Sequence, residues 1–313
     1  MSSTSPSSLK IVESSGNSVN EKSLFVRRGK YKTNDFEAMD AEIIALHAQN
    51  NVPETLRLFT AGLLRLVLLT GEREKTRGRF SCPGATQVME KGDTFLANFS
   101  GDALIDPTKE LPALFSAISR YAELNRVEAY ADEMQKSPNE TPLLNTVFIA
   151  VIDKQFSSRI EAISYFSKLL KVIGDFDAQS GSSVAQGYSR DPLDPMYIIS
   201  IGGIPFFVNV LHDHETNDHQ SENPGILFVP QAIFEHQKKR MRQGGLSEYD
   251  VMSDAVRKNL KNRYGDFSAG LNKNGEKSAL ANFLFYSTRE ESDAVAQVMG
   301  LDPDKTFTLI ERK

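Results

Sequence analysis

The stretch 196–235 constrains the fold more than any other part of the sequence. It holds three apolar runs, and the first two flank the pair Gly202-Gly203. A Gly-Gly pair between β-rich runs is typical of a hairpin turn. The third run, 226–229, ends at Pro230, which cannot donate to a sheet ladder and so marks a strand end or an edge strand. The stretch therefore predicts a β-hairpin followed by a third strand.

The rest of the chain alternates helical and strand-like patterns, which predicts an α/β or α+β fold. We expect a single domain over residues 35–313, with a mixed sheet that contains the central hairpin and is flanked by helices. Residues 1–34 are rich in Ser, Asn, Lys and Gly, and they are predicted to form a disordered tail. Apolar spacing predicts helices at 35–50, 55–69, 107–130, 159–176, 247–263 and 289–299. Strands are predicted at 93–99, 144–152, 282–286 and 306–310.

Composition narrows the functional classes. The net charge of −5 argues against a general nucleic-acid binder, which would carry a basic face. No apolar run approaches the roughly 20 residues that span a bilayer, and the N-terminus lacks the pattern of a secretory signal. A single cysteine cannot form an internal disulfide, so we expect a cytoplasmic protein. From the charge and the apolar runs we expect no nucleic-acid partner and no membrane association. Walker A, Rossmann, HExxH and GxSxG motifs are all absent from the sequence.

Cys82 is the only thiol and lies in the segment FSCPG. Pro83 favours an extended conformation at Cys82, and Gly84 allows a turn, so the thiol is expected at a strand end or in a loop. One interpretation is a small buried apolar residue. The other is a thiolate, acting as a nucleophile or as an axial ligand of haem iron, with Arg77 and Arg79 nearby to favour the charged form.

Three of the five histidines lie in the loop after the hairpin, at His212, His214 and His219. In an extended segment His212 and His214 would face the same side, which is how many metal sites begin. The alternative is a solvated polar loop without a metal.

Carboxylates surround the same stretch. The hairpin could bring four of them near one site, where they would suit a cationic substrate because a carboxylate accepts a bidentate guanidinium. The alternative is that each is an isolated surface acid. These residues are Asp191, Asp194, Glu222 and Glu235.

The ordered motifs of the chain resemble the YqcI/YcgG family over roughly residues 75–280. The motifs are RFSCPG, DPMYIISIGGIPFFV, FVPQAIFE and RYGD, in that order along the chain. Characterised members of that family are haem-dependent N-hydroxylases that act on guanidino groups of arginine or arginine-derived compounds.

The resemblance implies a haem-dependent monooxygenase that N-hydroxylates a guanidino or amino group of a small cationic, arginine-like metabolite. Cys82 would be the thiolate ligand of haem b, because a thiolate favours O–O cleavage. Asp194 and Glu235 would lie on the substrate side, and His214 would be a distal or proton-relay group. Molecular oxygen and an external electron donor or redox partner are also implied, and a homodimer is left open.

Two alternatives remain open at this point. The first is a non-haem metal-dependent oxygenase or metal-binding protein that uses His212, His214 and His219. The second is a non-catalytic interaction protein that keeps the fold.

Overall fold

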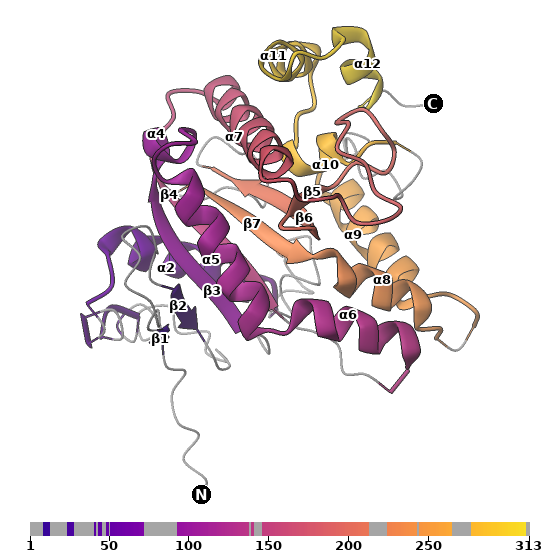
Figure 1. Ribbon diagram of the computed structural model, residues 1–313, viewed down its shortest axis with the longest axis horizontal. Coiled ribbons are helices and arrows are strands. Elements are labelled where there is room, and N and C mark those ends of the chain that lie inside the picture. The colour runs from indigo at the N-terminus through magenta and orange to yellow at the C-terminus, as the bar shows by residue number, and fades with distance from the viewer. Residues whose placement is uncertain are drawn as a thin grey trace, which may run out of the picture.

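The computed structural model describes residues 9–12, 24–27, 51–71, 93–137, 139–140, 146–212, 224–242, 244–264 and 277–310, together with residues 41, 43–45 and 48–49. The chain forms one seven-stranded sheet in the order β1-β2-β3-β4-β7-β6-β5 (Figure 1). The strands are β1 (Leu9–Val12), β2 (Leu24–Arg27), β3 (Asp93–Ser100), β4 (Thr146–Asp153), β5 (Ile199–Ile201), β6 (Ile204–Leu211) and β7 (Gly225–Pro230).

The sheet is mixed, which confirms the predicted fold class. Strands β3 and β4 are parallel, whereas β4–β7, β7–β6 and β6–β5 are antiparallel. Strand β4 lies near the middle of the sheet, and its residues from Thr146 to Ile152 are all buried. This is why its sequence, TVFIAVID, is almost continuously apolar rather than alternating.

The predicted hairpin is present, with β5 and β6 joined through Gly202-Gly203. Ile201 pairs with Ile204, and the two turn residues have φ values of 61° and 83°. Such positive φ values are available to glycine at little cost, so the pair sets the two-residue turn. Strand β7 is also confirmed, and Pro230 ends it, although β7 is an interior strand between β4 and β6.

Helices cover both faces of the sheet (Figure 1). The helices named here are α2 (Glu54–Gly71), α4 (Gly101–Leu104), α5 (Leu111–Leu124), α6 (Val127–Lys136), α7 (Arg159–Gln179), α8 (Gln231–Lys239), α9 (Glu248–Tyr264), α10 (Leu280–Leu284), α11 (Arg289–Met299) and α12 (Pro303–Thr308). None of the helices in the described part of the chain is long and apolar enough to cross a membrane.

The main core lies between the sheet and helices α5 and α7, and it contains Phe95, Phe148, Phe166 and Phe228. Helix α2 contacts β3 and β4 on the opposite face. There the ring of Phe59 lies so close to β7 that a side chain at Gly225 would come within 2.9 Å of it. Glycine therefore allows the close approach of α2 to the sheet.

Two predicted strands are helices instead. The segment 282–286 overlaps α10, whose five residues are all buried, so the sequence shows no strand or helix period there. The segment 306–310 overlaps α12. Asp302 caps that helix by accepting the N–H groups of Asp304 and Lys305, and Pro303 fits its first turn.

The helix predicted at 107–130 is in fact two helices. Helix α5 ends at Leu124, and α6 begins at Val127 after Arg126, whose φ is 51°. This left-handed residue turns the chain, so α6 leaves the sheet and lies beside α8 (Figure 1). The break positions α6 as one wall of a cavity.

The predicted disordered tail is corrected in part. Within residues 1–34 the structure describes β1 and β2, and β2 pairs with β3 through Phe25 and Leu96. Leu24, Phe25 and Val26 are buried. The burial of these three side chains against the sheet supplies the stabilisation that composition alone does not reveal.

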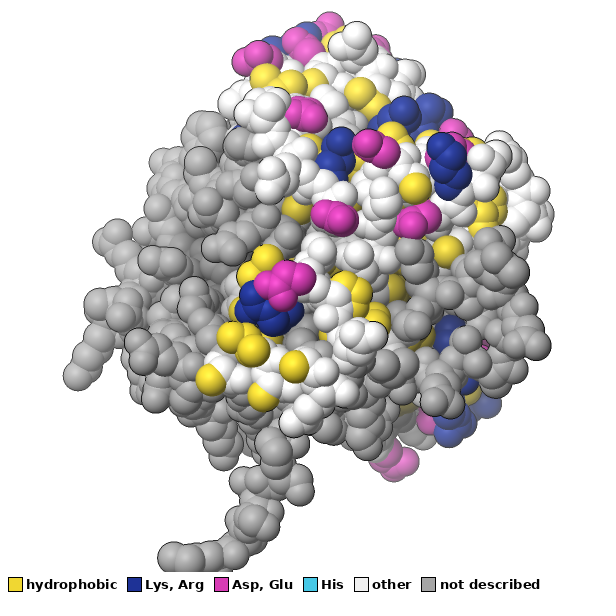
Figure 2. All heavy atoms as spheres, turned by 90° about the vertical axis from the view of Figure 1, so that its left-hand side faces the viewer, with side chains coloured by type: hydrophobic (Ala, Val, Ile, Leu, Met, Phe, Trp, Pro, Cys, Tyr) yellow, Lys and Arg dark blue, Asp and Glu magenta, His cyan; other side chains and the backbone are white. Residues whose placement is uncertain are grey.

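Charges of both signs are interspersed on the face shown in Figure 2, among the residues that are described there. Neither Lys and Arg nor Asp and Glu form a continuous patch on that described surface.

Candidate functional site

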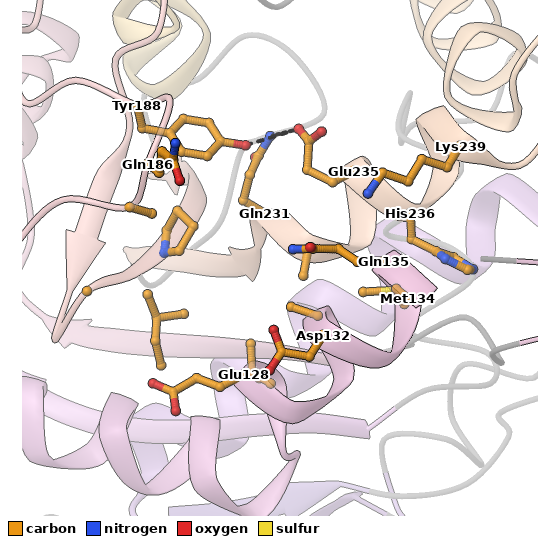
Figure 3. Close-up of a pocket in the computed structure, with 17 residues that line it drawn as sticks. Glu128, Asp132, Met134, Gln135, Gln186, Tyr188, Gln231, Glu235, His236 and Lys239 are labelled. Atoms are coloured by element: carbon orange, nitrogen blue, oxygen red, sulfur yellow. Dashed lines mark hydrogen bonds between the residues drawn. The ribbon is translucent and has the colours of Figure 1, made fainter. Parts of the chain in front are cut away.

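A cavity of about 520 Å³ lies beside the sheet, between α6 and α8 (Figure 3). The hairpin turn at Gly203 and the loop residues from Ala185 to Tyr188 complete its wall. The volume falls within the roughly 300–1,000 Å³ that is usual for small-molecule sites. The cavity is therefore large enough for a metabolite.

Three residues of the segment FVPQAIFE line the cavity: Gln231, Ala232 and Glu235. Strand β7 ends at Pro230, which immediately precedes α8, so Gln231 and Glu235 lie one helical turn apart on the same face. The amide Nε2 of Gln231 donates to Glu235 Oε1 at 3.1 Å. A strand end followed at once by a helix thus places an amide and a carboxylate side by side in the wall.

Glu235 is held by three donors. Besides Gln231, the Tyr188 hydroxyl donates to Glu235 Oε1 at 3.0 Å, and Lys238 Nζ does so at 2.8 Å. Figure 3 shows the side chains of Gln231, Tyr188 and Glu235. All the hydrogen bonds that Glu235 receives from the described residues reach Oε1. The other oxygen, Oε2, is left to accept a hydrogen bond from a ligand.

The surroundings keep Glu235 ionised. Partial burial works to raise the pKa of its carboxyl, but the Lys238 ammonium and the hydrogen bonds from Gln231 and Tyr188 outweigh it, so the pKa is lowered. Burial and the nearby Glu235 charge raise the pKa of Tyr188. At neutral pH the pair is therefore a carboxylate and a neutral phenol that donates to it.

The pKa of Glu235 can be tested directly. In an NMR titration the Glu235 carboxyl should show a midpoint below the ordinary value of 4.5. Lys238→Met should move that midpoint upward, since it removes the main cause of the lowering. Because its pKa is lowered in the folded state, ionised Glu235 stabilises the fold above its ordinary pKa. This contribution is lost as the pH falls through the lowered pKa. An unchanged midpoint in Lys238→Met would contradict the assignment.

Gln231 lines the cavity and holds a buried acceptor without a partner. The residue is 2% exposed, and its Oε1 receives no hydrogen bond. Because Nε2 donates to a carboxylate that is ionised, the two ends of the amide cannot be exchanged. A buried acceptor left unpaired costs about 1–3 kcal/mol. A ligand N–H group would remove this cost.

His236 follows Glu235 and lies at the edge of the cavity beside Tyr130. The ring is buried, and its Nδ1 has no hydrogen-bond partner. Burial and the Arg240 guanidinium lower the pKa of His236. The imidazole is therefore neutral at pH 7 and adds no positive charge to the site.

The opposite wall is also acidic. Glu128 and Asp132 of α6 face the cavity across from Glu235, and both are exposed (Figure 3). Among the described lining side chains, the basic ones are Lys239 and the neutral His236. Even with the Lys238 ammonium that pairs with Glu235, the three carboxylates outnumber the two ammonium groups beside them, which favours cations in the cavity.

The predicted carboxylates have different positions. Glu235 lines the cavity, as a substrate-side carboxylate would, whereas Asp194 is not part of the lining. Asp194 Oδ1 accepts the Met196 N–H at 2.7 Å, and Asp191 Oδ1 accepts the Leu193 N–H at 3.0 Å. These two acids hold the turns that lead into β5, so the structure does not bring Asp194 together with Glu235 in the cavity. Glu222 lies outside the described residues.

His212 follows directly after β6 and is fully buried. Its ring stacks on Phe166 with centroids 6.1 Å apart and meets Phe156 edge-on at 6.4 Å. Within the described ranges, no group of three or more His, Cys, Asp or Glu side chains could hold a metal ion. His214, His219 and Cys82 lie outside those ranges, so the metal and haem assignments stay predictions.

Several lining residues were not foreseen from the sequence. Gln231 could have been found, because its spacing of four from Glu235 after Pro230 is visible in FVPQAIFE. Tyr188 could not, since 47 residues separate it from Glu235. Glu128 and Asp132 were hidden because the predicted helix at 107–130 includes Glu128 but ends before Asp132, whereas both lie on α6.

The fold and the cavity together define an α/β protein with one mixed sheet and an acidic, ligand-sized site at its margin. The chain belongs to the YqcI/YcgG family, whose model matches residues 74–296. This confirms the family membership that the motifs predicted. No curated protein and no solved structure matches the chain.

Proposed function

We propose that this chain binds a small cationic metabolite in the cavity between α6 and α8 and N-hydroxylates its amino or guanidino group with the help of haem. The observation that carries the cation-binding part is the ionised Glu235, whose Oε2 receives no hydrogen bond from the described residues. The buried Oε1 of Gln231 stands beside it as a second acceptor.

In this proposal each lining residue has a limited task. Glu235 accepts the cationic group, and Gln231 Oε1 accepts a second N–H of the same group. Tyr188 and Lys238 hold the carboxylate in place and ionised. The site therefore binds and orients the nitrogen that is to be hydroxylated.

The haem part of the proposal rests on the family resemblance and on Cys82. A thiolate-ligated haem supplies oxygen activation when it is bound. The described cavity does not fit the porphyrin itself, because its three carboxylates would repel the haem propionates. We therefore assign the described cavity to the substrate and expect Cys82 to hold the iron next to it, outside the described lining.

An absorbance spectrum of protein expressed with added haem tests the haem part. We expect a Soret band, and we expect Cys82→Ala to abolish the spectral signature of thiolate ligation. Retention of that signature in Cys82→Ala would move the axial ligand to another residue. A protein that shows no Soret band despite the haem supply would contradict the proposed N-hydroxylase.

A further inference from the structure

The carboxylates of the cavity lie on two separate walls. Glu128 and Asp132 belong to α6, and Glu235 belongs to α8 on the other side (Figure 3). A single ammonium or guanidinium bound at Glu235 would leave the two α6 carboxylates without a salt bridge to any described residue. The two acidic walls therefore favour a ligand that carries a second positive group.

Among the described residues, the α6 pair has no salt-bridge partner. Glu128 and Asp132 are four residues apart, so their like charges repel on one face of the helix. Neither makes a salt bridge with a described residue, whereas Glu133 on the same helix pairs with Arg126 at 3.4 Å. Glu128 lies in the first turn and gains from the helix dipole, but Asp132 lies beyond that turn. A bound cation would relieve the repulsion.

The lining between the two acidic regions contains apolar side chains, with Gln135 among them (Figure 3). Ala131 and Val127 of α6, Ile204 and Pro205 of the hairpin, and Ala232 of α8 line the cavity. Such side chains suit methylene groups and offer no hydrogen bonds. The unpartnered Oε1 of Gln231, 2% exposed, independently marks the Glu235 end as a place for an N–H donor.

We infer that the ligand is a linear dication: a polymethylene chain with an ammonium or guanidinium group at each end and no carboxylate. One end would bind Glu235 and Gln231, and the other would bind Glu128 and Asp132. A ligand carboxylate would face three like charges, with Lys239 as its one counter-charge among the described lining residues. This inference rests on the proposed cation-binding function and names its substrate class.

Titration calorimetry with two matched pairs of compounds tests the inference. The first pair is 1,4-diaminobutane and butylamine, and the second is agmatine and arginine, which differ by one carboxylate. We expect 1,4-diaminobutane to bind at least about ten-fold more tightly than butylamine, because each charge-assisted hydrogen bond adds this much affinity. We expect agmatine to bind more tightly than arginine.

Variants locate the second group. The double variant Glu128→Gln/Asp132→Asn should lower the affinity for 1,4-diaminobutane much more than that for butylamine, so that the difference between the two compounds disappears. Glu133→Gln, on the same helix but outside the cavity, is the matched control and should change neither. Both substitutions are on exposed positions, and an unchanged melting temperature verifies the fold.

The outcomes separate the two proposals. Equal affinities for diamine and monoamine, or tighter binding of arginine than of agmatine, would overturn the dication and leave the cation site standing. Binding of none of the four compounds would overturn the proposed cation site and the inference together.

Discussion

Replacement of Asp177 by alanine is expected to lower the free energy of unfolding by about 3 kcal/mol. Asp177 is fully buried at the end of α7, and its Oδ2 accepts from Arg190 Nη2 at 2.6 Å. Its Oδ1 accepts the Gly202 N–H at 2.8 Å. Without the carboxylate, the Arg190 guanidinium and the hairpin turn each lose a partner. The value lies at the lower end for a buried pair because Arg190 is 31% exposed.

The matched control is Asp175→Ala, two residues earlier on the same helix. Asp175 is exposed and pairs with Lys171 at 3.3 Å, an i,i+4 pair worth less than about 0.5 kcal/mol. Urea denaturation of both variants measures the difference. Equal losses of stability in the two variants would contradict a stabilising role for the Asp177–Arg190 ion pair and the Asp177–Gly202 hydrogen bond.

Replacement of Glu235 by glutamine is expected to weaken agmatine binding by about 10–100-fold, because a hydrogen bond to a charged group is worth about 1.5–3 kcal/mol. Glutamine keeps the shape of the side chain and an oxygen for Tyr188 and Gln231. The change therefore removes the charge and leaves the wall in place.

Titration calorimetry measures this effect, and Glu133→Gln serves as the control for the loss of one negative charge. Glu133 is exposed and paired with Arg126, so we expect an affinity close to that of the unsubstituted protein. An agmatine affinity that is equal in Glu235→Gln and in Glu133→Gln would contradict a specific role of Glu235.

The sequence predicted the parts of the fold that depend on neighbours along the chain. Gly202-Gly203 defines its hairpin locally, and Ser158 caps α7 by accepting the Glu161 N–H. The segments at 282–286 and 306–310 were predicted wrongly because short apolar runs are compatible with either a strand or a helix. Strand β2 was missed because its burial comes from pairing with β3, far along the chain.

The site residues also differ in whether a local sequence pattern could reveal them. Glu235 was found because it ends a motif that reads as strand then helix, and Gln231 lies in that motif. Asp194 was selected from its proximity in sequence, but its carboxylate is used in a local turn. Tyr188 and the acidic pair on α6 reach the cavity through tertiary packing, which no local pattern reports.

The central claim, that a small cation occupies the cavity between α6 and α8, is tested most directly by a crystal structure of the protein with agmatine. We predict that one cationic end lies within hydrogen-bond distance of Glu235 Oε2 and Gln231 Oε1. Agmatine bound at another place, with Glu235 and Gln231 untouched, would contradict the account.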